Sequence, residues 1–335
     1  MLINYFIEPD AIPVADGIDR AVRRQLLDAI REYGIRAGSR CAWKELLDRI
    51  PQGERKLWEV VLERIPQNEF EVDLLSPSAV DVVLEHARDS VVALSEQSFV
   101  QWANAHRFPS NSEEELFRIA IPPQPNTAEV LTVPYFSSSE TYDDRRHWNE
   151  TGVQIGEHRD EIWNDRILPI LEHCTTVHIF DRYFLRQISQ IARTRHRSRD
   201  SGPFWLAEKI RTDLQSSPIA VKLYTWEVEG AVDTYNQQML QEFRDSAAEG
   251  ISELKCYIPA GGAHEVIPHD RHWRGASSKW SAKIEFGSSI EMFANSQFTQ
   301  NFQLKAFVLS SSTRSDLINV EHQIQRKCRP PLGNW

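Results

Sequence analysis

The sequence predicts an α/β protein made of two domains. The chain has 335 residues, more than one hydrophobic core usually holds, and typical domains contain roughly 100 to 200 residues. Hydrophobic residues make up 41% and charged residues 26%, which is the composition of a globular chain. Short apolar runs alternate with stretches of helical spacing, and this alternation favours parallel or mixed sheets flanked by helices.

The first part of the chain, residues 1–108, predicts a helix-rich α/β domain. Apolar runs predict buried strands over residues 3–7 and 90–94. Amphipathic spacing that stops at glycine or proline predicts the helices around them. These helices are expected over residues 19–33, 43–50, 57–65, 77–88 and 96–106.

Five prolines follow this domain within a short stretch of the sequence. They lie at Pro109, Pro122, Pro123, Pro125 and Pro134. Because proline lacks a backbone donor and breaks regular structure, we expect a Pro-rich linker over residues 109–134. The second domain is then expected over residues 135–335.

The sequence of the second domain predicts a mixed sheet flanked by helices. Its apolar runs predict strands over residues 176–180, 219–225, 253–258, 280–286 and 304–310. Helical spacing predicts helices over residues 162–173, 204–214 and 233–249.

Charge and cysteine content exclude several classes of protein. The net charge of −10 repels a polyanion unless basic residues gather on one face. The four cysteines lack the spacing of a disulfide framework or zinc site, and no apolar stretch reaches the roughly 18 residues of a membrane span. We expect a cytoplasmic protein with reduced thiols. Nucleotide-cofactor motifs are missing from the sequence, so no cofactor is expected.

One stretch, residues 268–295, has an order of residues typical of a functional site. A strand end is followed by His269 and Arg271, then by a strand, and then by Gly287 and Ser288 before a short helix. The phospholipase D superfamily carries His-x-Lys, an aspartate and Gly-Ser-x-Asn, and this stretch resembles that pattern in part. Arginine, alanine and isoleucine replace the lysine, aspartate and asparagine, so phosphate binding is better retained than catalysis.

A closer resemblance is to the phospholipase D-like domain at the C-terminus of MIT-domain proteins. The matching stretches are HDR at 269–271, a lysine-bearing strand and glycine at 283–287, residues 290–293, and the strand with its Asp-x-Tyr turn at 177–183. The resemblance covers roughly residues 160–310 and implies a mixed sheet flanked by helices. Bacterial chains with this domain are associated with phage defence, so the resemblance also implies a defence role.

The resemblance implies metal-independent attack on a phosphodiester. His269 would be the nucleophile, because an imidazole can attack phosphorus when a carboxylate such as Asp181 holds its other nitrogen. Arg271 and Lys283 would clamp the phosphate oxygens, and Ser288 would steady the same phosphate.

Two alternatives accompany this assignment. Glu291 could replace Asp181 as the carboxylate, and His269 with Asp270 could simply cap a strand in a surface loop. Because the chain has a single His-x-Arg half-site, catalysis would require a homodimer that joins two copies.

A basic cluster over residues 193–199 is the clearest candidate in this acidic chain for binding a polyanion. It is expected to contact phosphate or nucleic acid, or alternatively to dock an acidic protein partner. The basic candidates are Arg182, Arg193, Arg195, Arg197, Arg199 and Arg274. The aromatic candidates for base stacking are Tyr183, Trp226, Trp273 and Trp280.

Three other hypotheses stay open. The second domain could be a catalytically inactive, phosphate-recognising or protein-docking subunit of a defence complex, or it could bind anionic lipid headgroups. The first domain could hold two metal ions, as PIN-like nucleases do, although 48 acidic residues also align by chance. The carboxylates considered for that site are Glu8, Asp10, Asp16, Asp19, Asp73, Asp81 and Glu96.

Overall fold

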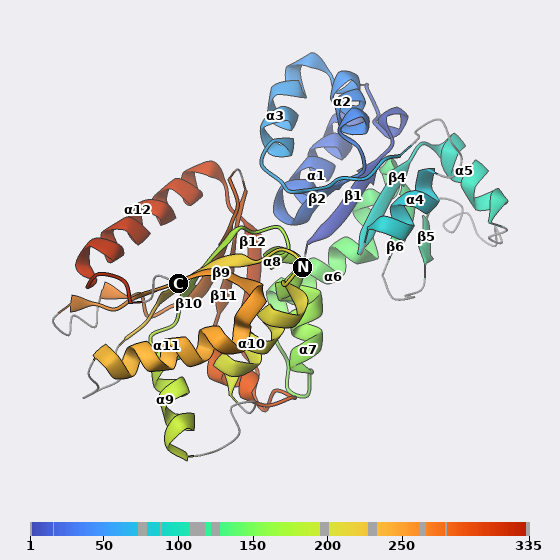
Figure 1. Cartoon of the computed structure of the whole chain (residues 1–335). Helices are drawn as coiled ribbons and strands as arrows, with labels where there is room; N and C mark the ends of the chain where they lie inside the picture. Colours follow the sequence, from blue (N-terminus) through green and yellow to red (C-terminus); the bar gives the residue numbers. More distant parts are fainter. Residues whose placement is uncertain are drawn as a thin grey trace. The chain divides into compact units, whose positions relative to one another are not determined.

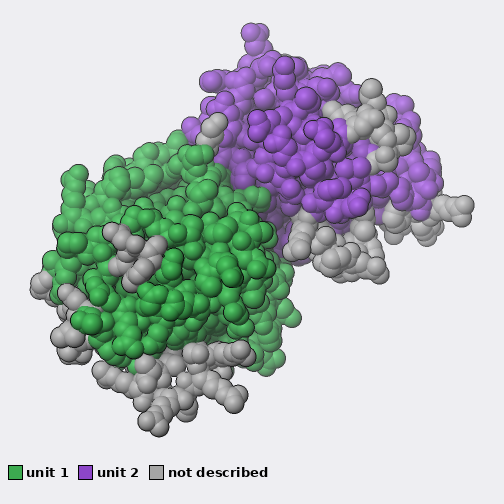
Figure 2. All heavy atoms as spheres, in the orientation of Figure 1, with its two compact units in different colours: residues 1, 148–335 green, residues 2–147 purple. Residues whose placement is uncertain are grey.

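Two β-sheets with their own helices form the structure, a computed structural model that confirms the predicted α/β class (Figure 1). The N-terminal unit comprises Leu2–His147 and the C-terminal unit comprises Trp148–Trp335 (Figure 2). The structure describes residues 2–15, 17–72, 79–87, 89–106, 118–121, 128–194, 201–226, 233–260, 266–278 and 280–332.

The N-terminal unit contains a six-stranded sheet in the order β3-β2-β1-β4-β6-β5. Its strands are β1 (Ile3–Ile7), β2 (Gly34–Ala37), β3 (Gln67–Asn68), β4 (Ser90–Leu94), β5 (Arg118–Ile121) and β6 (Ala128–Thr132). All neighbouring strands are parallel except β5, which runs antiparallel to β6. The helices are α1 (Ile18–Tyr33), α2 (Arg40–Arg49), α3 (Gln52–Leu62), α4 (Ala79–His86), α5 (Glu96–Ala105) and α6 (Glu140–Thr151).

Helices cover both faces of this sheet, which explains why its central strands are continuously apolar. In β1, Ile3 and Tyr5 join the core cluster that includes residues of α1, α2 and α3. Phe6 faces the other way and joins the cluster that includes residues of α4 and α5. The strands predicted over residues 3–7 and 90–94 are confirmed with the same bounds.

The predicted Pro-rich linker requires a correction. The described part of residues 109–134 forms β5, β6 and the start of the 3₁₀ turn Val133–Ser138, and β6 is fully buried beside β4. Prolines flank these strands and lie outside their paired residues, so they leave the ladder hydrogen bonds intact. The division between the units falls after His147, within α6, and not at residue 134.

The C-terminal unit contains a six-stranded mixed sheet in the order β12-β11-β10-β7-β8-β9. Its strands are β7 (Thr176–Phe180), β8 (Ile219–Tyr224), β9 (Ile251–Tyr257), β10 (Arg271–Ala276), β11 (Ser281–Phe286) and β12 (Leu304–Val308). The first three are parallel to one another, whereas β10, β11 and β12 continue the sheet from β7 with antiparallel pairing.

Helices of the C-terminal unit lie on both sides of this sheet (Figure 1). They are α7 (Arg159–Ile162), α8 (Leu168–Leu171), α9 (Phe184–Thr194), α10 (Gly202–Asp213), α11 (Asp233–Ala247) and α12 (Ser311–Lys327). A π-helical turn, Trp163–Ile167, joins α7 to α8, so the helix predicted over residues 162–173 is present with an irregular centre. Within the described ranges, no helix has the length and apolar character needed to cross a bilayer.

The two faces of the second sheet differ in chemistry. One face is apolar, and α10 and α11 lie on that side (Figure 1). The other carries stacked rings from neighbouring strands: the centroids of Phe180 and Tyr224 are 4.2 Å apart, and those of Phe180 and His272 are 4.4 Å apart. Helix α12 lies on this polar and aromatic face through Glu321 and Ile324.

Gly275 in β10 permits a close approach between the sheet and the end of α8. A Cβ atom at this position would lie 2.4 Å from the Cys174 sulfur, well inside van der Waals contact. The Cys174 thiol itself is buried and donates a hydrogen bond of 3.1 Å to the carbonyl oxygen of Ile170.

We expect Gly275→Ala to lower the free energy of unfolding by about 1 to 3 kcal/mol, because the new methyl group overpacks this contact. Removing the sulfur relieves the overlap, so Cys174→Ala combined with Gly275→Ala should cost less than the sum of the single variants. Urea denaturation of the four proteins of this cycle measures the difference. If the free-energy costs of the two single variants simply added in the double variant, contact with the Cys174 sulfur would not be the reason why residue 275 must be glycine.

Candidate functional site

Several predicted site residues meet at one edge of the second sheet. This edge is formed by the carboxyl ends of the parallel strands, where open α/β sheets usually bind ligands. Asp181 follows β7, Arg271 begins β10, and Ser288 follows β11. The pairing of His272 with Phe180 and of Arg271 with Phe286 brings these strand ends together. We call this group the strand-end site.

Asp181 is a buried carboxylate that joins two segments of this edge. The backbone N–H of Tyr183 donates to its Oδ1 at 2.9 Å, and the backbone N–H of Ile290 donates to its Oδ2 at 3.1 Å. Burial raises the pKa of Asp181, and these backbone hydrogen bonds and the charge of Arg271 oppose that shift. Both carboxylate oxygens are therefore engaged in holding the backbone.

The turn after β11 is fixed from a second side. Ser289 caps the short 3₁₀ turn Ile290–Ala294, and the side-chain amide of Gln187 in α9 donates to its hydroxyl. The other amide atom of Gln187, Oε1, is buried without a hydrogen-bond partner. The sequence pattern did not predict these two residues, although Ser289 directly follows Ser288 and Gln187 lies four residues after Tyr183.

Gly202, the first residue of α10, lies directly against this turn. A Cβ atom there would come within 1.8 Å of the Ile290 carbonyl oxygen, which is a backbone atom and cannot rotate away. Only glycine therefore allows α10 to pack at this distance, and the position of the turn depends on it.

Arg271 is the unpaired cation of the strand-end site. Its guanidinium carbon lies 5.5 Å from the centroid of the Tyr183 ring. Its Nε atom is buried and has no hydrogen-bond partner. Among the described residues, none forms an ion pair or hydrogen bond with this side chain. A buried donor without a partner costs about 1 to 3 kcal/mol, so Arg271 is the group here with most to gain from an anion.

Arg182 has a different environment, although it is adjacent to Asp181. Its Nε donates to the carbonyl oxygens of Ile267 at 2.8 Å and of Pro268 at 3.1 Å. Its guanidinium carbon lies 4.7 Å from the Trp226 ring centroid. Arg182 therefore holds the loop that leads to His269, and its donors are directed to that loop.

His269 lies on the surface in the bend before β10. No described residue accepts or donates a hydrogen bond to its side chain. Asp181, the carboxylate expected to hold it, is occupied by backbone N–H groups, and Glu291 is exposed in the turn after Ser289. The His–carboxylate pair expected for a nucleophile is not assembled within the described part of the chain.

Lys283 is separated from Arg271 by the sheet. Lys283 pairs with Arg274 across β10 and β11, three residues from Arg271, which is about 10 Å along the strand. Because side chains alternate between faces, Lys283 shares the face of Arg274, whereas Arg271 points to the other. Its Nζ forms an ion pair of 2.6 Å with Glu285. The predicted clamp of Arg271 and Lys283 on one phosphate is therefore not formed.

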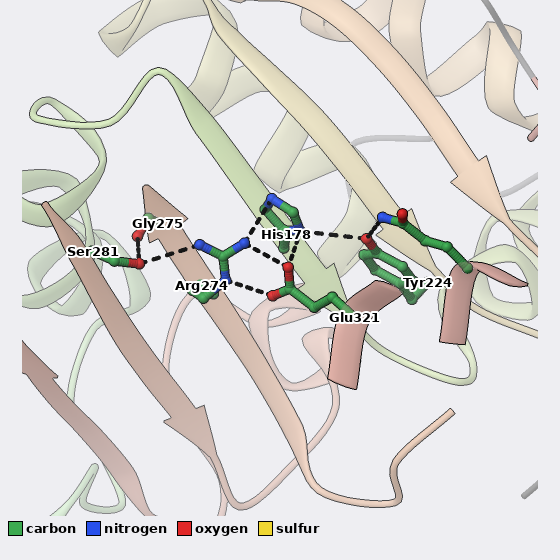
Figure 3. Close-up of polar contacts among 7 residues, drawn as sticks. His178, Tyr224, Arg274, Gly275, Ser281 and Glu321 are labelled. Carbon is green, nitrogen blue, oxygen red and sulfur yellow. Dashed lines mark hydrogen bonds and ion pairs between the residues drawn. The ribbon is translucent and has the colours of Figure 1, made fainter. Parts of the chain in front are cut away.

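Arg274 lies in a buried cluster on the polar face, drawn in Figure 3. Its guanidinium donates to both carboxylate oxygens of Glu321 in α12, each at 2.5 Å. It also donates to Ser281 Oγ at 3.3 Å and to His178 Nε2 at 3.0 Å. Arg274 is therefore engaged in attaching α12 to the sheet, away from the strand-end site.

The contacts of His178 assign its protonation state. Nε2 faces a guanidinium donor and must accept, whereas Nδ1 lies 3.1 Å from Glu321 Oε2 and donates to it. This arrangement requires a neutral ring, and burial lowers the pKa of His178 in agreement. Burial alone would raise the pKa of Glu321, but its hydrogen bonds with His178 and Arg274 lower it to about 2.

Comparison of the sequence with protein-family models and with curated proteins finds no match. The resemblance to the phospholipase D-like domain therefore stays a prediction, and the geometry of the site carries the functional argument.

The basic cluster predicted over residues 193–199 stays a prediction as well. Arg195, Arg197 and Arg199 lie outside the described residues, and Arg193 is described only as part of the α9 backbone.

Four of the candidate carboxylates of the N-terminal unit, Glu8, Asp10, Asp19 and Asp81, have structural partners. Glu8 accepts from the Ser95 backbone N–H at 2.7 Å and from the Ser98 hydroxyl at 2.6 Å, which caps α5. Asp10 forms an ion pair with Arg49. Asp16 and Asp73 lie outside the described residues. In the part of the chain that is described, no three metal-ligating side chains converge.

We expect Glu321→Gln to lower the free energy of unfolding at neutral pH by about 3 to 5 kcal/mol, because Arg274 would stay buried without its counter-charge. Since the folded pKa of Glu321 is depressed from 4.5 to about 2, its contribution is present above pH 4.5 and is lost as the pH falls towards 2. The variant should therefore lose less stability than wild type across that range.

Urea denaturation at several pH values measures both effects. The exposed Glu249→Gln on the same unit is the matched control and should behave as wild type. Equal pH dependence in wild type and Glu321→Gln would contradict the assigned role of this carboxylate.

Proposed function

We propose that the C-terminal unit binds a phosphate-bearing ligand at the strand-end site. The observation that carries this proposal is Arg271, a half-buried cation that forms no ion pair with a described residue and has a buried Nε donor without an acceptor. Guanidinium groups match phosphate oxygens in charge and geometry.

The surroundings of Arg271 suit binding at a fixed position. Tyr183 contacts the guanidinium through its ring, which restricts the arginine before any ligand arrives. Ser288 is half-buried in the turn that Asp181 and Gln187 hold in place, and its hydroxyl could donate to the same phosphate. A preorganised site loses less conformational entropy on binding than a flexible one.

Binding without cleavage is the simpler activity for this geometry. Phosphoryl attack by His269 needs an orienting carboxylate and cations on the phosphate oxygens, and among the described residues no carboxylate contacts the His269 side chain. Metal-independent cleavage would need an orienting carboxylate from a second copy of the chain, as in the predicted homodimer. A role in phage defence follows from the resemblance alone and is testable by phage plating on cells with and without the gene.

We expect Arg271→Gln to weaken binding of a simple phosphodiester, bis(p-nitrophenyl) phosphate, by about 10-fold to 100-fold, because one charge-assisted hydrogen-bonding group is lost. Titration of inorganic pyrophosphate as a competitor gives a second measure. Arg326→Gln, an exposed arginine of α12, is the matched control. Unchanged affinity in Arg271→Gln with an intact fold would contradict the proposed site.

The same probe separates binding from catalysis, since its hydrolysis releases coloured p-nitrophenolate. We expect no release above the uncatalysed rate by wild type in EDTA, and no change of affinity in His269→Ala. Metal-independent release that disappears in His269→Ala would overturn the binding-only assignment and establish the phosphodiesterase alternative.

A further inference from the structure

Two aromatic rings lie between two cations at the strand-end site. Arg271 lies over the Tyr183 ring at 5.5 Å, and the Tyr183 ring meets the Trp226 ring edge to face at 5.4 Å. Arg182 in turn lies over Trp226 at 4.7 Å. All four side chains are partly exposed, so the series reaches the surface at the same edge as the phosphate site.

The elements that carry these residues make the series rigid. Tyr183 follows Asp181 in the turn that the carboxylate holds, and the Trp226 backbone N–H donates to the Arg182 carbonyl at 3.0 Å. Arg182 is fixed by the carbonyl of Ile267. The rings therefore lie on backbone that is hydrogen-bonded on both sides.

An inorganic phosphate or a lipid headgroup would use Arg271 and make no contact with the exposed parts of the rings, which otherwise only pack against the two arginines and the sheet. A nucleic-acid strand presents a phosphate and an adjacent aromatic base, and protein aromatics bind single strands by stacking on bases. On the basis of the proposed phosphate site, we propose that its ligand is a single-stranded nucleic acid, with a phosphate on Arg271 and the neighbouring base against Tyr183 and Trp226.

The charge around the site favours a single-stranded over a double-stranded nucleic acid as the ligand. Arg186 lies three residues after Tyr183 on α9, is exposed, and forms no ion pair with a described residue. Among the described residues, Arg271 and Arg186 supply only a few phosphate contacts, and the chain has a net charge of −10, whereas duplex binding generally rests on many such contacts. Base stacking supplies the remaining affinity and is open only to unpaired bases.

The test compares two ligands that share a backbone. A 12-mer of thymidine and a 12-mer with abasic tetrahydrofuran sugars carry the same phosphates, and only the first carries bases. We expect the full chain to bind the thymidine strand about 5-fold to 100-fold more tightly, measured by fluorescence anisotropy of labelled strands. In Tyr183→Ala the two affinities should become similar, whereas Tyr183→Phe should keep the preference.

Controls separate this inference from the proposed phosphate site. Tyr235→Ala removes a partly exposed tyrosine of α11 and should leave the preference unchanged. Tyr183→Ala should still bind pyrophosphate, which also shows that the variant is folded. Arg271→Gln should weaken both strands.

Each outcome has one meaning. Equal affinity of wild type for the two strands, with pyrophosphate binding retained, would overturn the nucleic-acid inference and leave the phosphate site standing. Binding to phosphatidylserine vesicles without binding to either strand would also overturn it, in favour of a lipid headgroup. If wild type bound neither the strands with a preference nor pyrophosphate at all, both proposals would be overturned.

Discussion

The strand-end site depends on one buried carboxylate. Asp181 accepts backbone hydrogen bonds from the turn that follows it and from Ile290, more than a hundred residues later in the chain. These bonds fix the distance between the end of β7 and the turn after β11, and they place Tyr183 next to Arg271. Loss of this carboxylate would leave two buried N–H groups without acceptors.

The same constraint decides the chemistry of the site. Both oxygens of Asp181 accept from backbone N–H groups, and no contact among the described residues joins this carboxylate to the His269 imidazole. His269 lies on the surface as a loop residue, whereas Arg271 has a buried Nε without a hydrogen-bond partner and is the group that we propose to bind a ligand. Within the described ranges, the arrangement lacks the coupled His–carboxylate pair expected of a nucleophile, which favours the proposed binding role over catalysis.

Much of the fold was predictable because its strands are short apolar runs. β1, β4 and β7 have the predicted bounds, since buried parallel strands combine apolar composition with clear ends. β10 was not predicted as a strand because its sequence, RHWRGA, is rich in charge, and α12 was missed because it buries little besides Glu321 and Ile324. Both β10 and α12 depend on a tertiary contact, because Glu321 in α12 neutralises Arg274 in β10. The sequence of either element alone does not show this pairing.

The candidate site was predictable only in part for the same reason. The resemblance grouped Asp181, Arg271 and Ser288 around one phosphate, and the structure places these three residues at one edge of the sheet. The sequence could not separate Arg271 from Lys283, since the two faces of a sheet are defined only once the register of β10 with β11 is known. Arg271 and Arg274 look alike in sequence, yet a difference of three positions turns one to the ligand edge and the other to a buried ion pair.

The proximity of Asp181 to Arg271 also limits which ligands can bind well. An ionised Asp181 offsets part of the arginine charge, so the site attracts a lone phosphate only weakly in a protein with a net charge of −10. Useful affinity must therefore come from a ligand that adds contacts next to the phosphate. In the proposed complex, the exposed parts of the Tyr183 and Trp226 rings supply such contacts to the planar base of a base-bearing phosphate, which a simple anion lacks.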